Sequence, residues 1–209
     1  MFNINSSFFR FITNIGNIII VSILWLIGCL PIVTIATSTS ALYYTCVKSI
    51  RHDRGYVINN FFHSYKSNLK QGIVLSTITL IVAFILSIDY QYIASLSPAP
   101  SYLIIIYRIA FSFFICLLIY LITNLSRFQL SFLGLLKLSL FMMIRHFYLT
   151  FVMVVIFITF GILLLSIPIS LLFLPGVCML LISLSMENIF KKYTDKAENY
   201  SMKDWYFEE

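Results

Sequence analysis

Side chains that could carry out chemistry are few in this sequence, and they are scattered. General acid–base catalysis needs positioned carboxylates or histidines. Five of the eight Asp and Glu residues lie at position 195 or later, and the other three are Asp53, Asp89 and Glu187. The three histidines are isolated, and the sequence has no HExxH motif, no His–carboxylate pair at helical spacing and no glycine-rich phosphate loop. We therefore expect no catalytic, metal-binding or cofactor-binding site, and a protein that is not an enzyme.

Two charged residues could act as a pair within the apolar part of the chain. Proton- and ion-coupled transporters mark their paths with charges buried in the membrane. Asp89 leaves the second apolar run and Arg108 lies early in the third, so the two could pair across neighbouring helices. Alternatively, each anchors the end of its own helix in the headgroup region.

The segment from Leu30 to Tyr44 is the most unusual local feature. Pro31 removes a backbone donor, and the Thr and Ser side chains after it can bond freed carbonyl groups or a neighbouring helix. The segment could line a small polar pocket or form a subunit contact; the alternative is a kink followed by close packing of small residues. The threonines that carry these interpretations are Thr34, Thr37 and Thr39.

The composition indicates what kind of structure must position these residues. Hydrophobic residues make up 60% of the 209 residues, charged residues only 11%, and the mean hydropathy is +0.96. Soluble domains carry about 25% charged residues. In a bilayer every backbone amide must be bonded internally, which leaves helices or a closed barrel, and long unbroken apolar runs favour helices.

Five apolar stretches are long enough to cross a bilayer. The longest run, from about position 147 to 186, is twice the length of one crossing and has Pro168 and Pro175 near its middle, so we divide it in two. The sequence predicts an all-α, polytopic transmembrane helical bundle that forms a single domain over residues 1–190, followed by a cytoplasmic tail over 191–209. The expected spans are residues 15–36, 71–88, 102–125, 147–167 and 169–186.

The basic residues give the expected orientation. With five spans, twelve of the fourteen Lys and Arg residues fall on one side, and only Arg10 and Arg108 fall on the other. The positive-inside rule then places the N-terminus outside and the C-terminus in the cytoplasm, although a re-entrant pair at Pro31–Ala41 would place the N-terminus inside. We interpret the net charge of +6 as this topology signal and not as a nucleic-acid surface.

Two basic stretches, residues 56–70 and 126–144, mix aromatic or apolar side chains with Lys and Arg. Such amphipathic segments lie along a membrane interface. We expect both at the cytoplasmic interface, where either could alternatively dock on a cytoplasmic partner.

Two motifs lie in the first half of the chain: LPIVTIATSTSALYY starts at Leu30, and FFHSYKSNLKQG starts at Phe61. Together they resemble the YesL family of bacterial integral membrane proteins. The resemblance covers about residues 17–71 in detail, and the remainder agrees mainly in the layout of the spans. The residues that match the family pattern are Leu30, Pro31, Thr34, Ala41, Leu42, Tyr43 and Tyr44, then Phe62, Tyr65, Lys66 and Asn68.

This resemblance implies a protein of the bacterial cytoplasmic membrane without established catalytic activity. Members of the family commonly accompany carbohydrate ABC importers, so we expect an accessory protein that binds the bilayer and the permease subunits of such an importer. The aromatic and acidic tail at Asp204–Glu209 could contribute to docking. The alternatives are an independent small-solute transporter or channel and, less favoured, a membrane enzyme that acts on a lipid or glycan.

Overall fold

The computed structural model describes residues 7–95, 101–128 and 130–194. Within these ranges the chain forms helices and short turns and no strand, which confirms the predicted all-α fold. The long helices are α1 (Ser7–Cys29), α4 (Leu69–Ser95), α5 (Ser101–Arg127), α7 (Phe147–Ser166) and α8 (Leu174–Thr194). The shorter helices are α2 (Ile35–Thr45), α3 (Val57–Ser67) and α6 (Phe132–Arg145), and the single-turn or π-helical elements are η1 (Ile32–Thr34), η2 (Cys46–Arg51) and η3 (Pro168–Leu172).

Four described helices are long and apolar enough to cross a membrane, and a fifth apolar helix is shorter. The fifth is the Leu174–Phe190 part of α8. This set is consistent with the predicted bundle of about five spans. The four longer segments are Ile12–Cys29, Leu69–Ile93, Tyr102–Arg127 and Phe147–Ser166.

The first expected span, residues 15–36, is not one continuous helix. Helix α1 ends at Cys29, and Pro31 has an extended backbone with φ −76° and ψ 113°. Proline cannot donate to the preceding turn, and its ring pushes the residue before it out of the helical region. The hydroxyl of Thr34 donates to the carbonyl of Gly28 at 2.8 Å and so closes the turn. A new helix, α2, then starts at Ile35.

Helix α2 turns back along the end of α1. The Ser38 hydroxyl donates to the carbonyl of Trp25 at 2.9 Å, and the Trp25 indole N–H donates to the Thr39 hydroxyl at 3.1 Å. Further from the turn, Val21 shares an apolar cluster with Leu42 and Cys46. Residues nearer the N-terminus of α1 contact residues nearer the C-terminus of α2. The two helices therefore run antiparallel.

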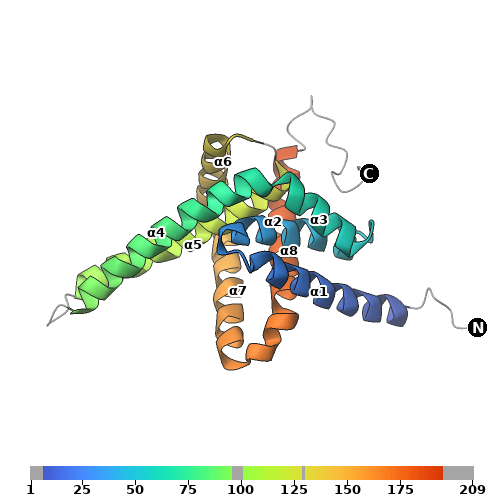
Figure 1. Cartoon of the computed structure of the whole chain (residues 1–209). Helices are drawn as coiled ribbons and strands as arrows, with labels where there is room; N and C mark the ends of the chain where they lie inside the picture. The colour runs from blue at the N-terminus through green and yellow to red at the C-terminus, as the bar shows by residue number, and fades with distance from the viewer. Residues whose placement is uncertain (1–6, 96–100, 129, 195–209) are drawn as a thin grey trace, which may run out of the picture.

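Helix α2 and η2, residues 35–51, form the centre of the molecule, which we call the hub. All residues of α2 from Ala36 to Tyr43 are buried, and α2 contacts α1, α3, α4, α5 and α8. In Figure 1 the α4–α5 hairpin and the α7–η3–α8 hairpin leave this centre in different directions, and α1 extends away from it on the opposite side from α4–α5. We call the two hairpins the α4–α5 arm and the α7–α8 arm.

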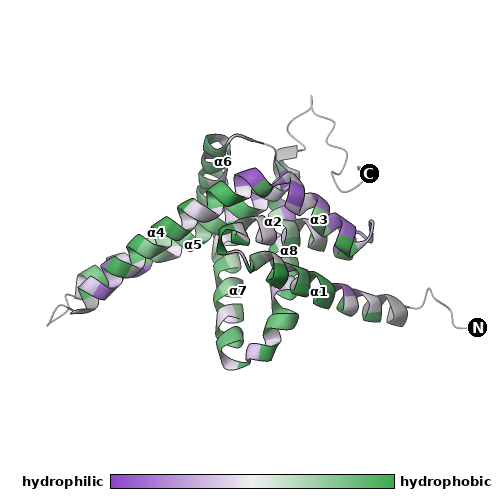
Figure 2. Cartoon of the chain, in the orientation of Figure 1, coloured by the Kyte–Doolittle hydropathy of each residue, from purple (hydrophilic) through white to green (hydrophobic). Residues whose placement is uncertain are grey.

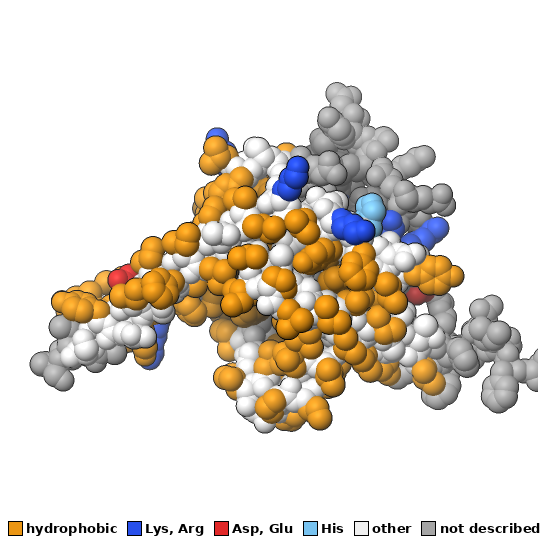
Figure 3. All heavy atoms as spheres, in the orientation of Figure 1, with side chains coloured by type: hydrophobic (Ala, Val, Ile, Leu, Met, Phe, Trp, Pro, Cys, Tyr) orange, Lys and Arg blue, Asp and Glu red, His pale blue; other side chains and the backbone are white. Residues whose placement is uncertain are grey.

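Hydrophobic and basic side chains are distributed differently over these parts. Figure 2 shows hydrophilic residues gathered on α3 and at the beginning of α4, whereas α7 is mostly hydrophobic. On the face drawn in Figure 3, most Lys and Arg side chains lie over the region of α3 and α6, and hydrophobic side chains cover much of the arms. Such a division is typical of a bundle whose arms lie in the bilayer and whose basic end lies at the interface.

Candidate functional site

A buried ion pair joins the end of α5 to α8. Arg127 Nη1 lies 2.8 Å from Glu187 Oε2, and the two side chains are only 7% and 4% exposed. The guanidinium also lies over the ring of Phe190, 4.5 Å from its centroid. A charged side chain at such low exposure is costly unless it is paired, so these contacts fix the end of α5 against α8.

The second oxygen of the same carboxylate is bonded to the hub. The Tyr43 hydroxyl donates to Glu187 Oε1 at 2.9 Å, and Tyr43 is fully buried. Burial first, and then the neighbouring carboxylate, raise the pKa of the Tyr43 phenol well above its ordinary value, so the phenol keeps its proton and remains a donor. We call Tyr43, Arg127 and Glu187 the carboxylate cluster.

The carboxylate cluster is built to hold three helices together. Both Glu187 oxygens have a protein donor, one from α2 and one from α5. Nearby, Arg51 of η2 donates to the carbonyl of Ser183 at 3.2 Å, which ties the hub to α8 a second time. A carboxylate whose two oxygens are both occupied is poorly placed to accept a proton from a substrate, and the geometry therefore favours a positioning role.

The Ser and Thr residues of α2 serve close helix packing. The backbone N–H of Ala36 donates to the Ser76 hydroxyl at 2.8 Å, which supplies a partner for a buried N–H group in the first turn of α2. Gly72 of α4 lies directly on Thr37, and a Cβ at Gly72 would come within 2.9 Å of Thr37 Cα. These contacts lie where α4 crosses the hub, so the polar segment indicated by the sequence is a packing surface for α1 and α4.

The first motif, LPIVTIATSTSALYY from Leu30 to Tyr44, has some residues in the core and others on the surface. Leu30 is 78% exposed and Pro31 is exposed at the turn. Ala41 and Leu42 lie in the apolar core of the hub, next to Tyr43 of the carboxylate cluster. Tyr44 is half-buried, and its hydroxyl accepts from Lys48 Nζ at 3.2 Å.

The second motif, FFHSYKSNLKQG from Phe61 to Gly72, also has some residues that face the hub and others that are exposed. Tyr65 stacks on buried Phe61, and the amide of Asn68 reaches the Ser40 hydroxyl at 3.5 Å, so these two residues face the hub. Phe62 and Lys66 lie on the exposed side of α3. The structure therefore brings most of the two motifs together and leaves Lys66 and one face of Phe62 exposed, with the Phe62 ring edge-on to Phe61.

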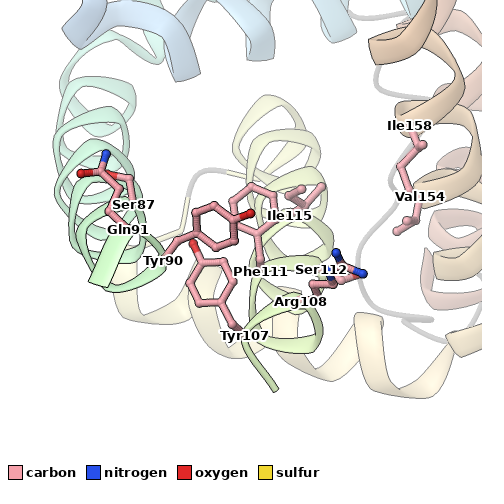
Figure 4. A pocket seen from close by; sticks show the side chains of 10 residues that line it. All are labelled: Ser87, Tyr90, Gln91, Tyr107, Arg108, Phe111, Ser112, Ile115, Val154 and Ile158. Atoms are coloured by element: carbon pink, nitrogen blue, oxygen red, sulfur yellow. The ribbon is translucent and has the colours of Figure 1, made fainter. Parts of the chain in front are cut away.

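Asp89 and Arg108 lie on the two helices of the α4–α5 arm, both exposed, and no ion pair joins these two described side chains. Arg108 instead lines a cleft of about 570 Å³ between the arm and α7. In Figure 4 the rings of Tyr90 and Tyr107 lie together on one side of the cleft, whereas Arg108 points away from them toward the helix that carries Val154.

A second cavity, of about 340 Å³, lies deeper in the bundle between α5, α7, α8 and the α1–α2 hairpin. Its wall is almost wholly apolar, with Thr39 and Thr123 as its hydroxyl-bearing residues. Ile115 of α5 lines both spaces, so the cleft and the cavity are neighbours.

Sequence reasoning missed the carboxylate cluster. Its members are 60 and 144 residues apart, so no local spacing indicates that they meet. One signal was available: Glu187 is the only acidic residue between Asp89 and Asp195, and it follows a long apolar run.

Among the described residues, no group of three or more His, Cys, Asp and Glu side chains could hold a metal ion. The tail at Asp204–Glu209 lies outside the described residues.

Part of the chain matches a known protein family. The family described as "Protein of unknown function, DUF624" matches residues 18–90, roughly a third of the chain. The matched part runs from α1 through the hub and α3 into α4, and so includes both motifs and the helix crossings around Thr37. No curated protein and no solved structure matches the chain.

Proposed function

We propose that this membrane protein is a non-catalytic accessory subunit that binds the permease subunits of a carbohydrate ABC importer in the bacterial cytoplasmic membrane. The long apolar helices and the DUF624 match support a multi-pass membrane protein. The importer is the finer part of the proposal and rests on the resemblance of the two motifs to the YesL family.

One observation carries the partner role: α3 presents a regular exposed stripe outside the four long candidate spans. Ile58, Phe62 and Lys66 lie four residues apart on a helix, which places them on one face. Phe62 is 46% exposed and Ile58 is 51% exposed, while the opposite face packs on the hub through Val57 and Phe61. An apolar stripe that ends in a lysine is suited to a groove on another protein.

The motif residues support the same assignment. Within the second motif, Tyr65 and Asn68 are used for packing on the hub. Phe62 and Lys66 are not required by the core, yet they belong to the pattern that carries the resemblance. A contact with another protein accounts for their position on the surface.

The expected orientation belongs to the same proposal. The N-terminus lies outside and the C-terminus lies in the cytoplasm, which places α3 and α6 with most basic residues at the cytoplasmic interface. Permease loops reach that interface, so the α3 stripe is on the side where the contact is needed.

The test is affinity purification from native membranes in mild detergent, with a tag at the C-terminus and mass spectrometry of the co-purified proteins. We expect the permease subunits of one sugar importer to be enriched over untagged cells and over an unrelated tagged membrane protein. The double variant Phe62→Ala/Lys66→Ala should reduce that enrichment about tenfold, as expected when an aromatic anchor of an interface is truncated.

The matched control is Phe84→Ala. Phe84 is 67% exposed on α4, within a candidate span, and it should have no effect on the enrichment. A wild-type protein that emerges alone would contradict the accessory role. Solute flux in liposomes that contain this protein alone, abolished by Asp89→Asn, would favour the independent transporter instead.

A further inference from the structure

We infer that the cleft between the α4–α5 arm and α7 binds one phospholipid, with the lipid phosphate at Arg108 and an acyl chain between α5 and α7. The site is separate from α3 and does not depend on the importer. It uses one of the two charged residues that the sequence singled out, in a role other than ion coupling.

The polar end of the cleft matches a phosphate. Among the described residues that line the cleft, Arg108 carries the only charge, and Ser112, one turn further along α5, supplies a hydroxyl donor on the same side. An arginine beside a neutral donor is a suitable site for a phosphate group, which has several acceptor oxygens and a negative charge. The hydroxyl of Tyr107 already donates to the carbonyl of Leu86 at 2.6 Å, so this ring forms the wall of the site.

The other end of the cleft matches a hydrocarbon chain. From Arg108 toward the C-terminal end of α5, the wall consists of Phe111 and Ile115 on α5 and of Val154 and Ile158 on α7. At Ile115 the wall continues into the apolar cavity, which reaches Ile122 on α5. From Arg108 to Ile122 the helix rises about 21 Å, which exceeds the roughly 15 Å of hydrocarbon in one leaflet.

The depth of Arg108 also fits a lipid headgroup. The candidate span Tyr102–Arg127 contains 26 residues, or about 39 Å of helix, against a hydrocarbon core of about 30 Å. The excess is about six residues over the two ends together, so Arg108, the seventh residue of the span, lies within about one helical turn of the outer boundary. Exposed Tyr90, Tyr92 and Tyr102 lie at the same end of the arm, as the aromatic belt of a membrane interface requires.

The positive charge of Arg108 favours binding of a phospholipid, which carries a negative phosphate, over binding of a diacylglycerol, which does not. A single uncompensated arginine in an amphipathic cleft attracts an anion that carries its own apolar chains. A lipid with the same chains but no phosphate would fill the apolar wall and leave Arg108 without an anion.

The test is native mass spectrometry of the full-length protein in detergent, with dioleoyl phosphatidylglycerol or dioleoylglycerol added at equal concentration. We expect one phosphatidylglycerol bound per protein, and dioleoylglycerol bound at least about tenfold more weakly. Arg108→Gln should weaken phosphatidylglycerol binding about tenfold, as expected for the loss of a charge-assisted hydrogen bond. Arg145→Gln removes an exposed arginine of α6, outside the cleft, and should leave binding unchanged.

A second measurement locates the lipid and does not depend on removing a charge. A photoreactive amino acid at Val154, activated in native membranes, should give a protein whose mass has increased by one phospholipid. Cross-linking to another protein would overturn the proposal and assign the cleft to a partner helix. Equal binding of the two lipids, or equal weakening by Arg108→Gln and Arg145→Gln, would also overturn it.

Discussion

Arg127 at the end of α5 and Glu187 on α8 form a 2.8 Å ion pair across 60 residues of chain. The pair is almost fully buried, and its carboxylate is shared with the hub through Tyr43. The relative positions of the two arms therefore depend on a buried polar contact.

Removal of one partner of this ion pair should destabilise the bundle strongly. Arg127→Met or Glu187→Met leaves a buried charge without its partner, at an expected cost of about 3–5 kcal/mol in the free energy of unfolding. The double variant Arg127→Met/Glu187→Met should recover part of this loss, because it buries no charge but still leaves the Tyr43 hydroxyl without its acceptor. Reversible unfolding in mixed micelles measures the four values.

The matched control for the ion pair is Arg145→Met, which removes an exposed arginine at the end of α6. We expect a loss below about 1 kcal/mol. If the two single variants and the control lose similar stability, the pair does not hold the arms.

Tyr43→Phe tests the contact between the hub and the carboxylate. The variant removes the donor to Glu187 Oε1 and leaves that oxygen without its buried partner. The expected cost is about 1–3 kcal/mol. Tyr44→Phe is the matched control: its ring is half-buried, and its hydroxyl interacts with the flexible Lys48, so the loss should be smaller. Equal losses would show that any tyrosine hydroxyl in this helix has the same effect.

Gly72→Ala tests the crossing of α4 over the hub. An added Cβ would meet the backbone as well as the side chain of Thr37, and backbone cannot move aside cheaply. We expect a loss of about 1–3 kcal/mol, measured by thermal unfolding in detergent. Gly161→Ala in α7 is the control, because no atom lies within 4 Å of its added Cβ, and it should be neutral or slightly stabilising.

The proposed orientation can be tested without any change in the helices. A fluorescent protein fused to the C-terminus should fold and fluoresce in the cytoplasm, and a protease site fused before Met1 should be cut from outside intact spheroplasts. The reason is the location of twelve of the fourteen basic residues on one side of a five-span bundle. Protection of the N-terminal site would favour the re-entrant arrangement at Pro31.

The sequence predicts the long apolar helices well because the length of an apolar run is a direct physical requirement of the bilayer. The run that starts at Phe147 is a helix from Phe147 to Ser166, and Pro168 begins the turn into the next helix. The first run ends earlier than expected because Pro31 ends α1, and hydrogen bonds of the following Thr and Ser residues favour a new helix that folds back.

The polar contacts between helices could not be predicted in the same way. Whether Glu187 meets Arg127 depends on how α5 and α8 are oriented and packed relative to each other, which a hydropathy profile does not predict. Likewise, the sequence places Asp89 and Arg108 at similar depths in the membrane. Whether they meet depends on which face of its helix each side chain occupies, and hydropathy does not predict that.

Helix α8 follows every helix to which Glu187 bonds, so it is synthesised last among them. During insertion, Tyr43 and Arg127 enter the membrane before the carboxylate that will bind them exists. Closure of the bundle is therefore coupled to completion of α8, because a chain that stops before Glu187 lacks the carboxylate that accepts from both Tyr43 and Arg127.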